Sequence, residues 1–492
     1  MKTKRFDRRS FLKTAGFGVS TFYIAKTSWA QQSPGDTLHT AVIGVNGRGR
    51  AHIGFTLANK HKGAKLSAIC EVDGKVLDAR LKDLERRKET VKGYRDMRRL
   101  FENKDIDIIT VATPNHWHSL ASIWAVQAGK HVYVEKPVSH NVWEGRQLVK
   151  AARKYKRIVQ TGSQCRSSDG IQNAVKWIQE GNLGKIEIAR GLCYKNRPSI
   201  GHVNAPVPIP EYIDYDLWSG PAPLVPSRRN NPKKGPIHYD WHWIWNYGNG
   251  DLGNQGIHQM DIARWFLGED ALSPQVWSIG GRVGYIDDGE TPNTQIIHHG
   301  YKKAPLIFEV RGLPKSKTES GRPAFLGASV GVIVHCEDGY LVNSNYSSCT
   351  AFDKQGKEIK KFNSTVSGHN AHFANLIDAI REGDHKILNA DIEEGHLSSA
   401  LCHTGNISHR LGKQAKPADL AALAAKSKGG TESYERMLEH LAKNEVSLKE
   451  YPMTLGPTLK MNPKNERFIG NNAANELLTR KYRKPFVVPK NV

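Results

Sequence analysis

The chain has 492 residues, so more than one domain is expected, because a single core rarely grows beyond roughly 250–300 residues. Hydrophobic residues make up 39% and charged residues 24%, which excludes a fibrous or disordered chain and favours a soluble globular protein. The formal net charge is +23, but the basic residues are spread along the chain. We therefore expect a solvated basic surface and no nucleic-acid partner.

The N-terminus has the features of an export signal. Arg8 and Arg9 precede Phe11-Leu12-Lys13, a modestly apolar stretch covers 14–24, and small residues allow cleavage after Ala30. We predict that residues 1–30 are a twin-arginine signal peptide and that the protein is periplasmic, with the twin-arginine translocase as a partner. Because that route carries folded proteins, any cofactor must be held tightly. No later segment predicts a membrane span.

A first buried strand is predicted at 38–43, followed by a glycine-rich turn and a helix at about 51–60. Such a turn lets backbone N–H groups approach a pyrophosphate at a helix N-terminus. Asparagine stands where the usual G-x-G-x-x-G fingerprint has its second glycine, and asparagine tolerates positive φ better than most residues. The residues assigned to cofactor binding in this turn are Gly44, Asn46, Gly47, Arg48 and Gly49.

The second predicted strand, 65–70, is followed by two acidic residues, Glu71 and Asp73. A carboxylate at this place accepts hydrogen bonds from ribose hydroxyls and repels a 2′-phosphate. The sequence therefore favours NAD, while Arg48 and Arg50 in the first turn keep NADP possible.

Two further strands, 105–112 and 131–134, end in polar motifs. The first leads into Thr113-Pro114-Asn115-His116-Trp117-His118, and the second into Glu135-Lys136-Pro137. These strands alternate with helices predicted near 76–87 and 118–128. The alternation predicts a doubly wound parallel sheet, which we place at 36–161.

Together with Asn254-Gln255-Gly256-Ile257-His258, these motifs resemble the glucose–fructose oxidoreductase / inositol dehydrogenase / MocA family over about 37–412. The resemblance implies an α/β fold, a Rossmann domain followed by a substrate domain (162–415) with an open, largely antiparallel sheet. It also implies hydride transfer at a sugar or polyol carbon, with Lys136 near the nicotinamide and His258 as acid/base. A homo-oligomer rests on the same resemblance. The strand-end residues assigned to the cofactor are Thr113, Pro114, Asn115, His118, Glu135 and Lys136.

An aromatic segment at 238–251 is the predicted sugar-facing wall. Three of the eleven tryptophans fall within five residues there. Flat aromatic faces pack against sugar C–H surfaces, and interleaved polar groups bind hydroxyls. We assign Asp240, Trp241 and His242 to the substrate. His238 and His242 are four residues apart, but the segment is not helical and no further ligand follows, so no metal is expected.

A helix predicted at 253–266 places Asn254, His258, Asp261 and Trp265 on one face. Many family members have an aspartate where Asn254 stands, and an amide cannot take a proton. Acid/base chemistry therefore shifts to His258 or Lys136, or to Tyr194 or His242. Asn254 remains a substrate contact.

Three functions stay open. The first is an NAD(P)-dependent oxidoreductase acting on a sugar, polyol or glycoside hydroxyl. The second is a glycosidase that uses NAD for oxidation at C3, elimination, water addition and re-reduction. The third is a non-catalytic glycan-binding protein.

Residues 416–492, Lys-rich and polar, are predicted to be a C-terminal extension. The six cysteines form no C-x-x-C pair, so we expect no disulfide framework.

Overall fold

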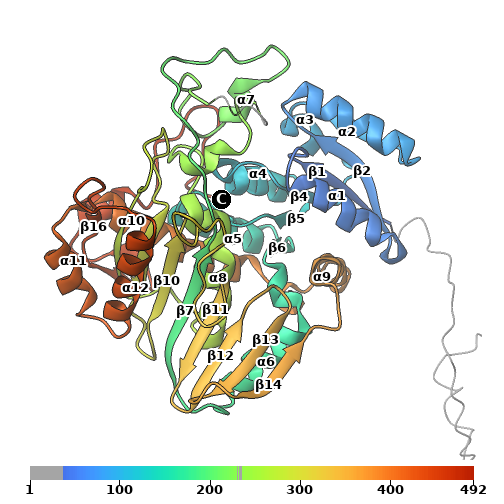
Figure 1. Ribbon diagram of the computed structural model, residues 1–492. Coiled ribbons are helices and arrows are strands. Elements are labelled where there is room, and N and C mark those ends of the chain that lie inside the picture. Colours follow the sequence, from blue (N-terminus) through green and yellow to red (C-terminus); the bar gives the residue numbers. More distant parts are fainter. Residues whose placement is uncertain (1–36, 230, 232–234) are drawn as a thin grey trace, which may run out of the picture. The chain divides into compact units, whose positions relative to one another are not determined.

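The computed structural model describes residues 37–229, 231 and 235–492 (Figure 1). The predicted signal peptide, 1–30, lies outside the described residues. From Leu38 to Val492 the chain forms one compact unit.

The N-terminal part of this unit is a parallel sheet with strand order β3-β2-β1-β4-β5-β6. Strands β1 and β5 have the predicted bounds, and β4 is buried at every residue, as a strand covered on both faces must be. The strands are β1 Leu38–Ile43, β2 Ala64–Cys70, β3 Lys92–Tyr94, β4 Ile108–Val111, β5 His131–Val134 and β6 Val159–Thr161.

Helices cover both faces of this sheet, because alternate strand residues point to opposite sides. Val42 packs with α1 and α2 on one face, whereas Ala41 and Ile43 pack with α3, α4 and α5 on the other. The helices are α1 Gly49–Ala58, α2 Gly74–Arg86, α3 Met97–Phe101, α4 Asn115–Gln127 and α5 Val142–Lys154. The predicted doubly wound fold is confirmed.

A larger sheet follows, with the order β14-β13-β12-β11-β7-β10-β9-β8-β16-β15 and with β17 also paired to β8. Its pairs are antiparallel except β7 with β10. This confirms the open, largely antiparallel sheet. The strands are β7 Ile186–Tyr194, β8 Gln275–Gly281, β9 Thr294–His299, β10 Leu306–Arg311, β11 Val330–Cys336, β12 Gly339–Asn343, β13 Ser348–Asp353, β14 Glu358–Asn363, β15 Lys413–Gln414, β16 Thr454–Leu455, β17 Leu459–Asn462 and β18 Arg467–Phe468.

Helices cover the two faces of the larger sheet unequally. Phe308 packs with α6, α8 and α10, and its neighbour Ile307 packs with α11 and α12 on the opposite face (Figure 1). The helices that cover this sheet are α6 Asp169–Gln179, α8 Ile257–Leu267, α10 Ile392–Arg410, α11 Pro417–Ala424 and α12 Gly430–Lys443. The remaining helices are α7 Tyr215–Ser219, α9 Gly368–Glu382, which packs against the first sheet, and α13 Asn472–Glu476.

Residues 416–492 are built into both sheets. Helices α11 and α12 cover the larger sheet, and β16 and β17 add to its β8 edge. The chain then returns to the first sheet, where Phe486 packs edge-on against Trp117 with ring centroids 5.5 Å apart.

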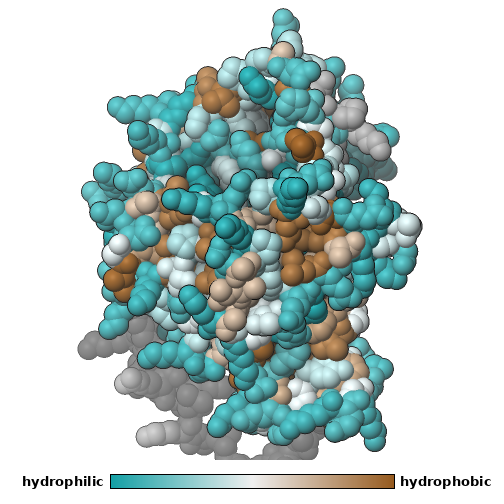
Figure 2. Space-filling model, turned by 60° about the vertical axis from the view of Figure 1, so that its left-hand side comes forward, coloured by the Kyte–Doolittle hydropathy of each residue, from teal (hydrophilic) through white to brown (hydrophobic). Residues whose placement is uncertain are grey.

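The surface in Figure 2 is mainly hydrophilic, with separate hydrophobic patches. Within the described ranges, no helix is long and apolar enough to cross a membrane. All six cysteines are buried and free.

Candidate functional site

A cavity of about 760 Å³ lies at the carboxyl ends of the parallel strands. That is where open α/β sheets bind their ligands. Many of the predicted site residues come together in its wall: Gly44, Asn46, Gly47, Arg48, Glu71, Thr113, Pro114, Asn115, His118, Glu135, Lys136, Trp241, His242, Asn254 and His258.

The turn between β1 and α1 requires glycine at two positions. Gly44 has φ +82°, and a Cβ there would lie 2.7 Å from the Ala112 carbonyl oxygen. A Cβ on Gly49 would lie 1.8 Å from the Gly44 oxygen. Gly49 does not line the cavity; its lack of a side chain lets the start of α1 pack tightly against the turn, and its cofactor contact stays a prediction.

The two acidic residues after β2 have different roles. Glu71 lines the cavity, and its carboxylate accepts hydrogen bonds from the backbone N–H groups of Val45 (2.9 Å) and Asp73 (3.2 Å). Burial raises the pKa of Glu71. Asp73 lies outside the cavity lining, which corrects the prediction. Its carboxylate caps α2 by accepting from Val76 N and bonds His238 Nε2 at 3.0 Å.

Glu135 holds a buried cluster of charges beside the cofactor turn. Its Oε1 accepts hydrogen bonds from Arg48 Nε (2.6 Å) and lies 3.0 Å from His52 Nε2. Burial acts to raise the pKa of Glu135, but the Arg48 guanidinium and His52 hold it well below its usual range. The ionised carboxylate therefore ties the first turn of the Rossmann domain to the Glu135-Lys136-Pro137 loop.

His118 links two loops instead of presenting a free nitrogen to a ligand. Its Nδ1 lies 2.6 Å from the Pro137 carbonyl oxygen and its Nε2 lies 2.7 Å from that of Thr113. Although the ring lines the cavity, both nitrogens are engaged. His118 therefore positions the loops that follow β4 and β5.

Lys136 and His258, the residues predicted to do the acid/base chemistry, both line the cavity. Lys136 Nζ donates to the backbone carbonyl of Asn254, and burial, reinforced by Arg48 and Lys195, lowers its pKa to about 8 against the opposing effect of Glu135. Burial and the charge of Lys136 hold the pKa of His258 well below its usual range. The His258 ring lines the cavity, and its Nδ1 is buried with no hydrogen-bond partner among the described residues.

The helix predicted at 253–266 is not regular. Residues Leu252–Gly256 form a π-helical turn, and α8 begins only at Ile257. Such widened turns are frequent at functional sites. Here Asn254 presents its backbone carbonyl to Lys136. Asp261 does not line the cavity and pairs with the buried Arg166 at 2.9 Å, and the same guanidinium lies over the Trp265 ring, so these two residues of the predicted face contact Arg166 and not the cavity.

Two predicted residues lie elsewhere. Side chains alternate along β7, and Tyr194 points to the α12 side of the sheet, away from the main cavity. Its hydroxyl donates to Glu309 Oε2 there at 2.7 Å. Asp240 is buried beside Asn231, whose amide donates to it at 3.1 Å, and it lines a neighbouring cavity instead.

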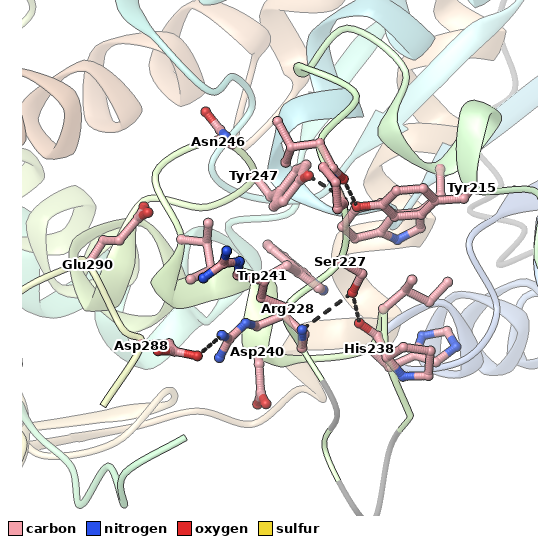
Figure 3. Close-up of a pocket in the computed structure, with 17 residues that line it drawn as sticks. Tyr215, Ser227, Arg228, His238, Asp240, Trp241, Asn246, Tyr247, Asp288 and Glu290 are labelled. Atoms are coloured by element: carbon pink, nitrogen blue, oxygen red, sulfur yellow. Dashed lines mark hydrogen bonds and ion pairs between the residues drawn. The ribbon is translucent and has the colours of Figure 1, made fainter. Parts of the chain in front are cut away.

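That neighbouring cavity has a volume of about 270 Å³ and shares Trp218, Ile237, His238 and Trp241 with the main one. Figure 3 shows aromatic side chains, including Tyr215 and Trp241, on its walls together with the carboxylates of Asp240, Asp288 and Glu290. The aromatic segment therefore separates two adjoining cavities.

Sequence reasoning missed several residues of the main cavity, among them Gln164, Leu217, Trp218, Tyr346 and His369. The Tyr346 ring packs edge-on against His258, with centroids 5.4 Å apart. These residues stand far apart in the chain and form no local motif. Among the described residues no cluster of three or more His, Cys, Asp or Glu side chains could hold a metal.

Two family models match the chain. The first, an oxidoreductase family with an NAD-binding Rossmann fold, covers residues 38–163, and the second, the C-terminal alpha/beta domain of the same family, covers 171–293. The chain belongs to the GFO/IDH/MocA family. The predicted resemblance is confirmed, and NAD is the cofactor that this family's Rossmann domain binds.

Characterised relatives match over part of their length. Levoglucosan dehydrogenase of Pseudarthrobacter phenanthrenivorans is 26% identical over 35% of this chain and 36% of its own. A glycosyl hydrolase family 109 protein of Shewanella pealeana is 30% identical over 30% and 38%. Inositol 2-dehydrogenase of Salmonella typhimurium is 26% identical over 37% and 53%. The match thus spans about half or less of each relative.

Solved structures share the fold. Levoglucosan dehydrogenase in complex with NADH and levoglucosan aligns with a TM-score of 0.56 and 16% identity, over 74% of this chain and 95% of that one. The WlbA dehydrogenase of Bordetella pertussis, in complex with NADH and UDP-GlcNAcA, aligns at 0.53 and 20%, over 74% and 94%.

Proposed function

We propose that this GFO/IDH/MocA protein is an NAD-dependent oxidoreductase that acts on a hydroxyl of a sugar, polyol or glycoside while holding its cofactor tightly. The observation that carries the proposal is the presence of both Lys136 and His258 in the wall of one cavity at the strand ends, with Lys136 held by the Asn254 carbonyl. The cavity fits the cofactor, because the turn before α1 lines it and the Glu71 carboxylate stands at the end of β2.

Lys136 and His258 have different roles in the proton transfer. When bound, the nicotinamide supplies the hydride acceptor for the substrate carbon. Lys136, cationic below its pKa of about 8, donates a hydrogen bond to the substrate oxygen and lowers the pKa of that hydroxyl. His258 is neutral because its pKa is depressed, so the unprotonated nitrogen of its ring accepts the proton. Asn254 orients the lysine through its carbonyl.

Tight retention of the cofactor is supported by a segment that crosses one side of the cavity. We call residues 212–220 the strap. The Tyr212 carbonyl accepts hydrogen bonds from Gly74 N (2.8 Å) and Arg95 Nη2 (2.9 Å), and the Leu217 carbonyl accepts from Trp117 Nε1 (2.9 Å). Strap residues Leu217 and Trp218 line the cavity.

The first test is mass spectrometry of the small molecules released when the purified protein is denatured. We expect a nicotinamide dinucleotide at about one per chain. If none is released and added NAD or NADP does not bind, the proposal fails and a non-catalytic glycan-binding role replaces it. The identity of the released molecule also decides between NAD and NADP.

Replacement of Lys136 tests the site itself. We expect Lys136→Ala to lower kcat/KM by about 10²–10⁴-fold with an unchanged fold, because a positioned acid/base group contributes about that much. Tyr194→Phe is the control: Tyr194 lies across the sheet, so kcat/KM should be unchanged. Unaltered turnover in Lys136→Ala would overturn the site assignment.

A second candidate is cleavage of a glycosidic bond without net redox. The adjoining 270 Å³ cavity favours it, because aromatic walls beside the main cavity can hold the second unit of a glycoside. An aryl glycoside hydrolysed without added NAD, with deuterium from D₂O appearing at C2 of the product, would select this candidate. Net reduction of added NAD would select the first.

Export and assembly are also proposals. The twin-arginine motif supports a periplasmic protein, and replacement of Arg8 and Arg9 by lysine should leave it in the cytoplasm on fractionation.

Since α11 and α12 cover part of the larger sheet, a homo-oligomer through this sheet would use its β12–β13 part, where Tyr340 and Phe352 are partly exposed. Light scattering would measure the mass of the assembly, and the mass of a single chain would contradict the homo-oligomer.

A further inference from the structure

A separate cavity of about 270 Å³ is enclosed by four segments that are distant in the chain. They are residues 140–141 after β5, residues 245–249, the end of α10, and residues 476–480. The cavity shares no lining residue with the catalytic cavity. Its function is therefore independent of the proposed oxidoreductase chemistry.

Two arginines line this cavity without a carboxylate partner. Arg480 Nη1 donates to the carbonyl of Asn246 (3.0 Å) and to His140 Nδ1 (3.3 Å), and the Arg410 guanidinium lies 5.4 Å from the Trp245 ring centroid. Neither forms a salt bridge within the described part of the chain, whereas the buried Arg166 and Arg197 are paired with aspartates. Two guanidinium groups thus keep donors for a ligand.

The surrounding acidic groups do not neutralise these arginines directly. Glu144 is occupied by Asn141 and the Tyr482 hydroxyl, and Glu290 accepts from Trp245 N. Glu476 lies at the exposed rim. Arg410 is the last residue of α10, so its charge offsets the partial negative charge of that helix end.

His140 provides a third donor. A guanidinium can only donate, so His140 Nδ1 accepts from Arg480 and the neutral ring carries its proton on Nε2. Burial and Arg480 hold the pKa of His140 well below its usual range, so the ring is neutral. Nε2 is buried and has no hydrogen-bond partner, which is costly unless a ligand or water satisfies it.

Two further buried side chains in the lining have unpartnered atoms. Asn249 donates its Nδ2 to the His140 carbonyl at 3.0 Å, while its Oδ1 has no partner. His403 contacts Ser139 through Nε2 at 3.0 Å and leaves Nδ1 without one. An amide oxygen accepts, so the cavity combines cationic donors with an acceptor suited to a hydroxyl.

We propose that this cavity binds a small oxyanion, with Arg410, Arg480 and His140 Nε2–H donating to it. Planar guanidinium groups recognise carboxylate and phosphate oxygens in the same way. The Asn249 Oδ1 acceptor suits a hydroxyl next to the anionic group, as in a sugar acid. Trp245 provides an apolar face beside Arg410.

Isothermal titration calorimetry of the full chain would test this with three probes: glucuronate, inorganic phosphate and glucose. We expect glucuronate or phosphate to bind and glucose not to bind. Arg410→Gln should weaken that binding at least about tenfold, since hydrogen bonds to charged groups contribute on this scale. Arg86→Gln, which removes an exposed charge of α2, a helix that contributes no lining residue, should not change it.

The Lys136→Ala variant separates this site from the catalytic cavity. Binding that survives Lys136→Ala and is lost in Arg410→Gln supports the proposal, and preference for glucuronate over phosphate identifies a sugar acid as the ligand class. Binding lost in Lys136→Ala but retained in Arg410→Gln would place the anion in the catalytic cavity and overturn the proposal. Absence of binding by both anions to the unaltered protein would also overturn it.

Discussion

Lys136 and His258 are both buried, and burial lowers the pKa of each side chain, but to different extents. Burial lowers the pKa of Lys136 only to about 8, because the charge of Glu135 opposes part of the effect. Among the described residues no carboxylate bonds to His258, and its pKa falls well below the usual range. At neutral pH the lysine is therefore charged and the histidine is neutral. This is the pair of states that a hydroxyl donor to the nicotinamide requires.

The pH dependence of oxidation follows from these two groups. We expect kcat/KM to stay level between pH 6 and 7 and to fall as pH rises through about 8, because Lys136 loses its proton there. No decline near pH 6.5 is expected on the acid side, since His258 remains neutral. Measured rates with a decline on acidification near pH 6.5 would contradict this and give His258 an ordinary pKa.

At the scale of the element, the β1–turn–α1 unit depends on two close backbone approaches. Gly44 has a positive φ and faces the Ala112 carbonyl, and Gly49 faces the Gly44 carbonyl. Side chains at either place would force the turn away from the strand ends. The asparagine at position 46 lies in the cavity wall without disturbing either approach.

We expect Gly44→Ala to weaken NADH binding at least about tenfold, because strained backbone costs of order 1–3 kcal/mol and the new Cβ meets a carbonyl. Fluorescence titration with NADH would measure it. Gly54→Ala in α1 is the matched control: nothing lies within 4 Å of its Cβ, so affinity should be unchanged and stability should rise by up to about 1 kcal/mol. Equal affinities for both variants would refute the role of Gly44.

At the scale of the whole molecule, segments far apart in sequence close the catalytic cavity. The strap is anchored to the Rossmann domain by Arg95, whose guanidinium donates to the carbonyls of Val72 (2.8 Å) and Tyr212 (2.9 Å). The C-terminus reaches the same region, where Arg483 Nε donates to the Gly220 carbonyl at 3.1 Å. We therefore expect cofactor retention to depend on contacts between segments that lie far apart in the chain.

We expect Arg95→Met to speed NADH release about fivefold, since it removes one hydrogen bond of about 1 kcal/mol to the strap, at the Tyr212 carbonyl. Stopped-flow dilution of the bound, fluorescent NADH would measure the rate. Arg86→Met removes an exposed arginine of α2 and should leave the rate unchanged. If both variants release NADH at the rate of the unaltered protein, the strap does not retain the cofactor.

The sequence by itself determined the alternation of strands and helices in the Rossmann domain, the glycine turn and the motifs after β4 and β5, because these depend on short-range patterns: buried strands, chain reversals and polar residues at strand ends. It also placed Lys136 and His258 among the candidates. Only the tertiary structure decided that Tyr194 faces the other side of β7, that Asp73 caps α2, and that Asp261 pairs with Arg166. Neither the strap nor the oxyanion cavity could be predicted from the sequence. Each joins segments through long-range packing, and such contacts leave no local pattern in the chain.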